Sequence, residues 1–357
     1  MTPYPQEHLP YTRVGPHSLG WGLVGASQIA RAAMIQAIQS QPPTPQAKAQ
    51  AGAWVAGIYS HNYERGMAFA QANNIATVYR SFMDLLGRAE IQCIYISSHP
   101  RHHSEQALAA LEAGKHVLVE APLALSMEAA QLLVRTAQER NLILAVNYRL
   151  RAEPALVRMQ QFVAEGAVGD IYGATIHNIN PLGLRQHTWR LKPRGGGVIL
   201  DRTIHSLDLL RFLFQDEIDA VSAFGAEQAW GEGVYDDVTV NVRMVRRGVL
   251  VQVRDSYIVP HARDRIELYG TTGTLLARGC FLPNTPGELF LVRHGQVQPI
   301  PISTVDPFWQ VIQRFNVAVR GGGPPISPGE DALVSLEAAL ITLAAAGNGQ
   351  TWVFPRS

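Results

Sequence analysis

The sequence predicts an α/β protein with two parts: an N-terminal doubly wound parallel sheet and a C-terminal α+β domain with an open-faced, largely antiparallel sheet. Two observations carry this prediction. From residue 19 to about 147, short apolar runs alternate with stretches of helical apolar spacing, which is typical of parallel strands joined by helices. After residue 150, strand-like runs with period-two alternation follow one another, which is typical of an antiparallel sheet with one open face.

The length of 357 residues favours two domains over one hydrophobic core. We expect a proline-rich tail over residues 1–18, a first domain over 19–147 and a second domain over 148–357. The tail has no apolar segment of the kind found in a secretory signal. No run of about 18 apolar residues is present, which predicts no transmembrane helix. We therefore expect the protein in the cytoplasm.

The elements of the first domain follow in order along the chain. The predicted strands span 19–25, 53–60, 91–98, 115–120 and 142–148, and the predicted helices span 27–39, 62–74, 102–114 and 126–140. A loop is expected over 41–52. Gly114 is suited to end its helix and Ser126 to cap the start of the next one.

The second domain combines fewer helices with more strands. Helices are predicted over 153–166, after the glycines at 195–197, and over about 306–320 and 329–346. The strand-like runs span 218–228, 238–245, 248–259, 264–270 and 288–294.

Composition and charge exclude several classes of function. Hydrophobic residues make up 47% of the chain and charged residues 17%, as in an ordinary folded protein. The formal net charge of +1 predicts no nucleic-acid partner, because nucleic-acid binding needs a concentrated basic surface. The two cysteines, Cys93 and Cys280, are too few for a disulfide framework or a four-ligand zinc site, and we predict no metal.

The turn after the first predicted strand, "GLVGASQIA" (22–30), has the form of a dinucleotide-binding loop. Such a loop needs a tight turn, backbone that can approach a pyrophosphate, and a small residue for packing of the helix against the sheet. Gly25 suits the turn and Ala30 the packing, while a serine stands where the middle glycine is usual. The candidate cofactor-binding residues here are Gly25, Ala26, Ser27, Gln28 and Ile29. A purely structural turn is the alternative.

The end of the second predicted strand bears on the choice between NAD(H) and NADP(H). A site that prefers NAD(H) usually places a carboxylate there to bind the ribose hydroxyls. This chain instead has Ser60, His61 and Arg65, each of which can donate hydrogen bonds to a 2′-phosphate. We expect NADP(H) to be preferred and NAD(H) to be possible, with a solvated helix start as the alternative for Arg65.

Five segments, in order, resemble the glucose–fructose oxidoreductase, inositol dehydrogenase and MocA-like family (Gfo/Idh/MocA). They are "GLVGASQIA", "HHSEQALAALEAGKHVLVEAPLAL", "NYRLRAEP", "TWRLKPRGGGVILDRTIHSLDLL" and "RIELYGTTGTL". The resemblance covers nearly the whole chain from about residue 20. It implies a Rossmann domain, a nicotinamide cofactor, a small sugar, cyclitol or keto substrate, and a homodimer or homotetramer assembled through the second sheet.

One position departs from the family pattern at its reactive centre. Relatives typically read Glu-Lys-Pro where this chain reads Glu120, Ala121 and Pro122. The resemblance implies that the lysine stabilises negative charge developing on the substrate oxygen, which an alanine cannot do. Glu120 and Ala121 remain candidates to face the cofactor, and an ion-paired core edge is the alternative for Glu120.

A second group of residues keeps the family pattern. Asp201, His205 and Asp208 have the spacing of one helix face, and the resemblance assigns the family's Asp and His to Asp201 and His205. His205 is the candidate general acid/base because the pKa of imidazole lies near neutrality. Asp201 is expected to orient His205 or to bind a hydroxyl, and Asp208 to be structural. A structural His–Asp pair is the alternative.

Other candidates come from segments that line the pocket in relatives. On the cofactor side these are Ser97, Ser98 and His103, the last with an expected packing role. The candidates for substrate binding are Tyr148, Arg149, Trp189 and Arg190. Lys192 is the one candidate to replace the missing ammonium, with an exposed loop lysine as the alternative.

These residues support three hypotheses. The first is an NADP(H)-preferring oxidoreductase that interconverts a hydroxyl and a carbonyl on a sugar- or cyclitol-like molecule. The second is a reductase of another acceptor, because biliverdin reductases of the same family also lack the lysine. The third is a cofactor-binding family member without catalysis, since a fold can persist after its chemistry is lost.

Overall fold

The computed structural model describes residues 18–40, 52–282 and 287–354. The predicted tail apart from Ser18, and the predicted loop apart from Gly52, lie outside the described residues. Among the helices of the described residues, none is long and apolar enough to cross a membrane.

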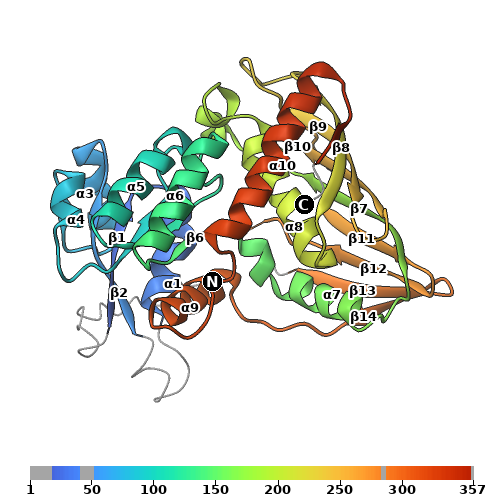
Figure 1. Ribbon diagram of the computed structural model, residues 1–357, viewed down its shortest axis with the longest axis horizontal. Coiled ribbons are helices and arrows are strands. Elements are labelled where there is room, and N and C mark those ends of the chain that lie inside the picture. Colours follow the sequence, from blue (N-terminus) through green and yellow to red (C-terminus); the bar gives the residue numbers. More distant parts are fainter. Residues whose placement is uncertain (1–17, 41–51, 283–286, 355–357) are drawn as a thin grey trace, which may run out of the picture.

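The first sheet has six parallel strands in the order β3-β2-β1-β4-β5-β6, which confirms the doubly wound parallel sheet (Figure 1). The strands are β1 (Leu19–Val24), β2 (Ala53–Tyr59), β3 (Val78–Tyr79), β4 (Cys93–Ile96), β5 (His116–Val119) and β6 (Leu144–Val146). The strand order reverses between β1 and β4, where the crevice outside the carboxyl ends of the strands is the usual site for a ligand.

Helices connect these strands as expected, and α4 (Phe82–Leu86) is a short helix that the sequence did not predict. The others are the π-helical turn η1 (Ala30–Met34) with α1 (Ile35–Gln39), then α3 (Tyr63–Ala72), α5 (His103–Glu112) and α6 (Met127–Glu139). Ser126 caps α6 by accepting a hydrogen bond from the backbone N–H of Ala129, as predicted. Gly114 follows the end of α5 with a φ of +74°, a conformation that glycine adopts without strain.

The second sheet has nine strands in the order β14-β13-β12-β11-β7-β10-β9-β8-β15. All neighbouring strands are antiparallel except β7 and β10, so the sheet is largely antiparallel, as predicted. The strands are β7 (Ile171–Ile179), β8 (Ile218–Ala226), β9 (Asp237–Met244), β10 (Leu250–Ser256), β11 (Arg265–Gly270), β12 (Gly273–Arg278), β13 (Glu288–Arg293), β14 (Gln296–Ile300) and β15 (Trp352–Val353).

One face of this sheet is covered by helices and the other is open, as Figure 1 shows. The covering helices are α7 (Pro154–Ala164), α8 (Ile204–Phe214) and α10 (Gly329–Asn348). Side chains that alternate with the buried ones are largely exposed on the open face, as for Phe224 by 72% and Leu250 by 66%.

A buried ion network joins the helices on the covered face. Asp208 on α8 is 1% exposed and accepts two hydrogen bonds of 2.8 Å from the guanidinium of Arg151. Ser335 on α10 donates to the same carboxylate at 2.7 Å. Arg151 also pairs with Asp331 at the start of α10. These contacts give Asp208 the structural role that the sequence predicted for it.

The helix α9 (Pro307–Val319) comes late in the chain but packs against the first sheet, beside α1 (Figure 1). Trp21 in β1 is fully buried and donates through its indole N–H to the side chain of Asn316 at 3.2 Å. The ring of Phe315 lies 5.1 Å from the ring of Trp21, centroid to centroid. The hydrophobic core of the first unit is therefore completed by a helix from the last sixth of the chain.

Candidate active site

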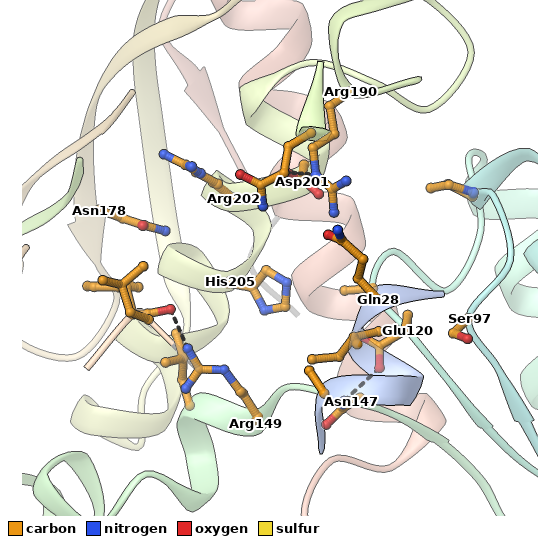
Figure 2. Close-up of a pocket in the computed structure, with 18 of the residues that line it drawn as sticks. Gln28, Ser97, Glu120, Asn147, Arg149, Asn178, Arg190, Asp201, Arg202 and His205 are labelled. Atoms are coloured by element: carbon orange, nitrogen blue, oxygen red, sulfur yellow. Dashed lines mark hydrogen bonds and ion pairs between the residues drawn. The ribbon is translucent and has the colours of Figure 1, made fainter. Parts of the chain in front are cut away.

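A cavity of about 440 Å³ lies between the carboxyl ends of the first sheet and the second unit. Figure 2 shows side chains from both units around it, with His205 at its centre. The predicted site residues that line this cavity are Gln28, Ile29, Ser97, Ser98, His103, Glu120, Ala121, Arg149, Trp189, Arg190, Asp201 and His205. The structure thus brings together most of the residues predicted for catalysis, substrate binding and the cofactor side.

The glycine loop closes the first-unit side of the site. Gly25 has a φ of +104°, and a Cβ atom there would lie 2.8 Å from the backbone N of Ser98, so a larger residue does not fit. Ser27 accepts a hydrogen bond from the backbone N–H of Ala30 at 3.1 Å and donates to Ser97 at 2.7 Å. The Ser27 hydroxyl proton is therefore directed at Ser97, and the Ala30 N–H is already bonded. The N–H groups of Gln28 and Ile29 make no hydrogen bond to the described residues and can receive an anion.

Arg65 reaches back over this loop from α3. Its guanidinium donates to the backbone carbonyl of Ala26 at 2.8 Å. Ser60 lies buried at the end of β2, whereas His61 is exposed beside it. This edge therefore offers a guanidinium and a hydroxyl without a carboxylate at the tip of β2, which fits the phosphates of a dinucleotide.

Glu120 and Ala121 follow β5 and face the cavity. One carboxylate oxygen of Glu120 accepts hydrogen bonds from the Tyr95 hydroxyl and, at 2.7 Å, from the Asn147 amide. Burial raises the pKa of Glu120, although these two hydrogen bonds oppose the shift. Glu120 is thus held by neutral donors, and it makes no ion pair with another of the described residues. The peptide bond from Ala121 to Pro122 is cis.

His103 has the packing role expected for it. Its two ring nitrogens lie 2.8 Å from the carbonyl oxygen of Pro122 and 3.1 Å from that of Ser98. The ring is buried, and burial lowers the pKa of His103. His103 therefore joins the turn after β5 to the end of β4 and holds both walls of the cofactor side in place.

Asp201 lies on a π-helical turn, η6 (Ile199–Thr203), that leads into α8. Its Oδ2 accepts hydrogen bonds from Arg190 Nε at 3.0 Å and from the Tyr257 hydroxyl at 2.8 Å. Burial opposes ionisation, but the guanidinium of Arg190 and the hydrogen bond from Tyr257 outweigh it and hold the pKa of Asp201 below its usual value. Asp201 therefore carries a fixed negative charge in the cavity wall.

His205 stands one turn further along, with its ring in the cavity (Figure 2). The ring packs edge-on against Tyr148, with 5.4 Å between centroids. No hydrogen bond joins His205 to another of the described residues. Burial lowers the pKa of its imidazole, although the carboxylates of Asp201 and Asp208 oppose the shift. A neutral imidazole with free ring nitrogens is suited to take a proton from a bound hydroxyl.

Comparison with known proteins identifies the family. The family model "Oxidoreductase family, NAD-binding Rossmann fold" matches residues 19–148, and the model "GFO/IDH/MocA C-terminal domain" matches residues 156–276. A 1,5-anhydro-D-fructose reductase from Ensifer adhaerens is 34% identical over 92% of this chain and 97% of its own. The chain belongs to the Gfo/Idh/MocA family. As a member of this family, it is an NAD(P)-dependent oxidoreductase.

A more distant relative and a solved structure are also similar to this chain. A myo-inositol 2-dehydrogenase from Thermotoga maritima is 24% identical over 73% of this chain and 79% of its own. The crystal structure of an aldose-aldose oxidoreductase from Caulobacter crescentus superposes with a TM-score of 0.84 at 20% identity, covering 94% of this chain and 100% of that one. This second likeness shows that the two proteins share a fold.

Two residues expected in the pocket of this family member lie elsewhere. The ammonium of Lys192 lies 3.8 Å from the carboxylate of Glu232, and its side chain is 61% exposed. The structure therefore does not bring Lys192 to the cavity beside Ala121. Tyr148 is buried behind His205 and does not line the cavity.

The cavity also contains residues that the sequence did not single out. They are Asn147, Asn178, Asn180, Gln186, Arg202, Phe281 and Phe308, among others. Arg202 directly follows Asp201, and this adjacency is the one feature of the sequence that could have pointed to Arg202 as a site residue. Phe308 belongs to α9, and nothing near it in the sequence connects it with the site.

Proposed function

We propose that this oxidoreductase interconverts a hydroxyl and a carbonyl on a sugar- or cyclitol-like small molecule, with NADP(H) as its preferred cofactor and His205 as its general acid/base. The observation that carries this proposal is the position of His205, which presents free ring nitrogens at the centre of a cavity opposite the Glu120 edge of the dinucleotide unit. The sugar and cyclitol substrates named for the two relatives above support the substrate class.

In this proposal, His205 and Asp201 have different roles in proton transfer. His205 takes the hydroxyl proton during oxidation and returns it to the carbonyl oxygen during reduction. Asp201, held ionised by Arg190 and Tyr257, stabilises the imidazolium that forms when His205 takes the proton. The nicotinamide, when bound, donates or accepts the hydride. Lys192 has no part in this proposal because it lies outside the cavity.

Residues of the first unit hold the dinucleotide in this proposal. Gly25, Ala26 and the helix start at Ser27, Gln28 and Ile29 face the pyrophosphate with backbone N–H groups. Ser60, His61 and Arg65 take the 2′-phosphate of NADP(H). Ser97, Ser98, Glu120 and Ala121 border the nicotinamide side of the cavity. Tyr148 supports His205 from behind, while Arg149, Trp189 and Arg190 bind the substrate.

Turnover on a panel of acceptors tests the function. NADPH is mixed with the protein and with keto-sugars, keto-cyclitols or bilins, and its absorbance is followed. We expect NADPH to be oxidised by a member of the first two groups. Oxidation by bilins alone would favour the biliverdin reductase-like alternative. NADPH binding, seen as altered nicotinamide fluorescence, without turnover of any acceptor would favour the non-catalytic alternative.

Arg65→Ala tests the cofactor preference. We expect the KM for NADPH to rise about tenfold or more, because a charge-assisted hydrogen bond to the 2′-phosphate is lost, while the KM for NADH stays within about twofold. Arg80→Ala is the control, since Arg80 stacks on the ring of Tyr63 at 4.2 Å and makes no contact with the glycine loop. Equal increases for both cofactors in Arg65→Ala would contradict the preference for NADP(H).

We further propose the domain division given above, with a tail over 1–18, a first domain over 19–147 and a second over 148–357, from which α9 returns to pack against the first sheet. The protein acts in the cytoplasm on a small molecule, as a homodimer or homotetramer. The open face of the nine-stranded sheet supports this assembly, because its exposed aromatic and aliphatic side chains offer an apolar contact surface.

A further inference from the structure

Arg202 enters the cavity from the π-helical turn and is fixed in place. Its Nη1 donates to the backbone carbonyls of Asn180, at 2.6 Å, and of Ser256. Its guanidinium also lies over the ring of Tyr257, 4.7 Å from the ring centroid. These contacts tie it to the ends of β7 and β10, so the guanidinium is already positioned before any ligand arrives.

Arg202 differs from the other cavity arginines in its charge balance. Arg190 pairs with Asp201 at 3.0 Å, and Arg149 lies 3.8 Å from the carboxylate of Glu153. Among the described residues, no carboxylate lies within the 4.0 Å of an ion pair with Arg202. A partly buried guanidinium stays charged, and the carboxylates of Asp201 and Asp255 act on it only beyond the distance of an ion pair, so part of the cost of burying its charge is not offset by a direct contact. An anion that enters the cavity would remove this cost.

The free side of Arg202 has a geometry suited to an oxyanion. Its Nε and Nη2 donate no hydrogen bond to the described residues, and together they form the side of the guanidinium that binds two oxygens in parallel. Asn178, only 6% exposed, also lines the cavity, and its side-chain amide has no hydrogen bond among the described residues. The cavity wall therefore presents two parallel N–H donors of a charged guanidinium, with the amide of Asn178 on the same side of the cavity (Figure 2).

This wall lies away from the cofactor edge. Figure 2 shows Arg202 and Asn178 on the opposite side of His205 from Gln28, Glu120 and Ser97. An anion at Arg202 is therefore separate from the dinucleotide phosphates, which the glycine loop receives. Such an anion belongs to the substrate, at the end away from the carbon that reacts beside the cofactor edge.

We propose that the substrate carries an oxyanion group, a carboxylate or a phosphate, and that Arg202 with Asn178 binds this group. The inference deepens the proposed function and rests on it: the substrate is a sugar acid or a sugar phosphate, and a neutral sugar leaves Arg202 without an anion in direct contact. Arg202 thereby determines specificity, while His205 carries the proton transfer.

Turnover with matched substrates tests the inference. Wild type, Arg202→Gln and Arg202→Lys are saturated with cofactor and given each sugar as the neutral compound, the sugar acid and the sugar phosphate. We expect wild type to prefer one acidic form, which identifies carboxylate or phosphate. Arg202→Gln should lower kcat/KM for that form about tenfold to a hundredfold, mainly through KM, with the neutral form within about twofold. Arg202→Lys should retain part of the preference, because it keeps the charge but not the fork.

The ratio of acidic to neutral turnover is taken within each variant, so a partly unfolded preparation does not change it. Arg185→Gln is the matched control. Arg185 is exposed and directly precedes Gln186, which lines the cavity, but Arg185 does not itself line the cavity. An equal loss for acidic and neutral forms in Arg202→Gln would overturn the inference and leave the proposed function standing.

A binding measurement separates the two proposals if no sugar is turned over. The Tm of the protein with NADPH is measured with each acidic compound and with its neutral partner. A rise in Tm with the acid in wild type, absent in Arg202→Gln, supports the anion site even where the proposed reaction fails. Equal Tm values for acidic and neutral compounds in wild type overturn it.

Discussion

Replacement of His205 by alanine is expected to lower kcat by roughly a hundredfold to ten-thousandfold, the usual contribution of a general acid/base. His205 is the one imidazole at the centre of the described cavity (Figure 2), and Ala121 leaves no lysine to share its task. The KM for the cofactor should remain within about twofold, because His205 is not among the residues that we propose to hold the dinucleotide. Steady-state kinetics on any substrate found by the acceptor panel gives both parameters.

The pH dependence separates proton transfer from simple positioning. Burial lowers the pKa of His205 from 6.5, so the imidazole is neutral at pH 7 and able to accept a proton. Oxidation of the hydroxyl should therefore slow only as the pH falls through this lowered pKa. His205→Gln keeps a polar side chain, but it should lose most of kcat. The remaining rate should no longer decrease as the pH falls through the pKa of His205.

His177→Ala is the control for these variants, because His177 lies on β7 outside the cavity. It should behave as wild type in both rate and pH profile. If His205→Ala kept more than about half of the wild-type kcat and showed the same decrease in rate at low pH, the assignment of His205 as acid/base would be wrong.

Asp208→Asn is expected to cost about 3–5 kcal/mol in the free energy of unfolding. The carboxylate of Asp208 accepts two hydrogen bonds from Arg151 and one from Ser335 in a buried setting. Within the described part of the chain, an asparagine leaves Asp331 as the one counterion of the Arg151 guanidinium, and the Asp331 side chain is 38% exposed. Denaturation by urea, followed by circular dichroism, measures the loss.

Asp170→Asn is the matched control for this prediction. Asp170 pairs with Arg247, and both side chains are more than 60% exposed. Exposed ion pairs contribute less than about 1 kcal/mol, so this variant should unfold close to wild type. Similar losses for Asp208→Asn and Asp170→Asn would show that the buried network contributes no more than a surface pair.

Much of the fold could be predicted from the sequence because hydrophobic periodicity reports burial directly. The alternation in β9 and β10 matches their alternating buried and exposed side chains. The strand β14 was missed because it lies at the sheet edge, with four of its five side chains exposed and a proline at 299. β3 and β15 have two residues each, too few for a periodic pattern.

The candidate site was predicted only where its residues lie in one local segment. The glycine loop and the Asp201–His205 pair are local, and Gln28 and Ile29 of the loop line the cavity together with Asp201 and His205. The spacing of a regular helix placed Asp208 on the same face, but α8 begins with a π-helical turn and Asp208 lies in the buried network. Arg202 was missed because the strand ends that fix it, at Asn180 and Ser256, are far from it in the sequence.

The return of α9 to the first sheet has a consequence for synthesis on the ribosome. When residue 147 has been added, all six strands of the first sheet exist, but the helix that packs on Trp21 does not. N-terminal domains commonly fold while the rest of the chain is still being made. Here the nascent first domain keeps the Trp21 face of its core uncovered until Phe315 and Asn316 have been translated. Its final packing is therefore among the last steps in making the protein.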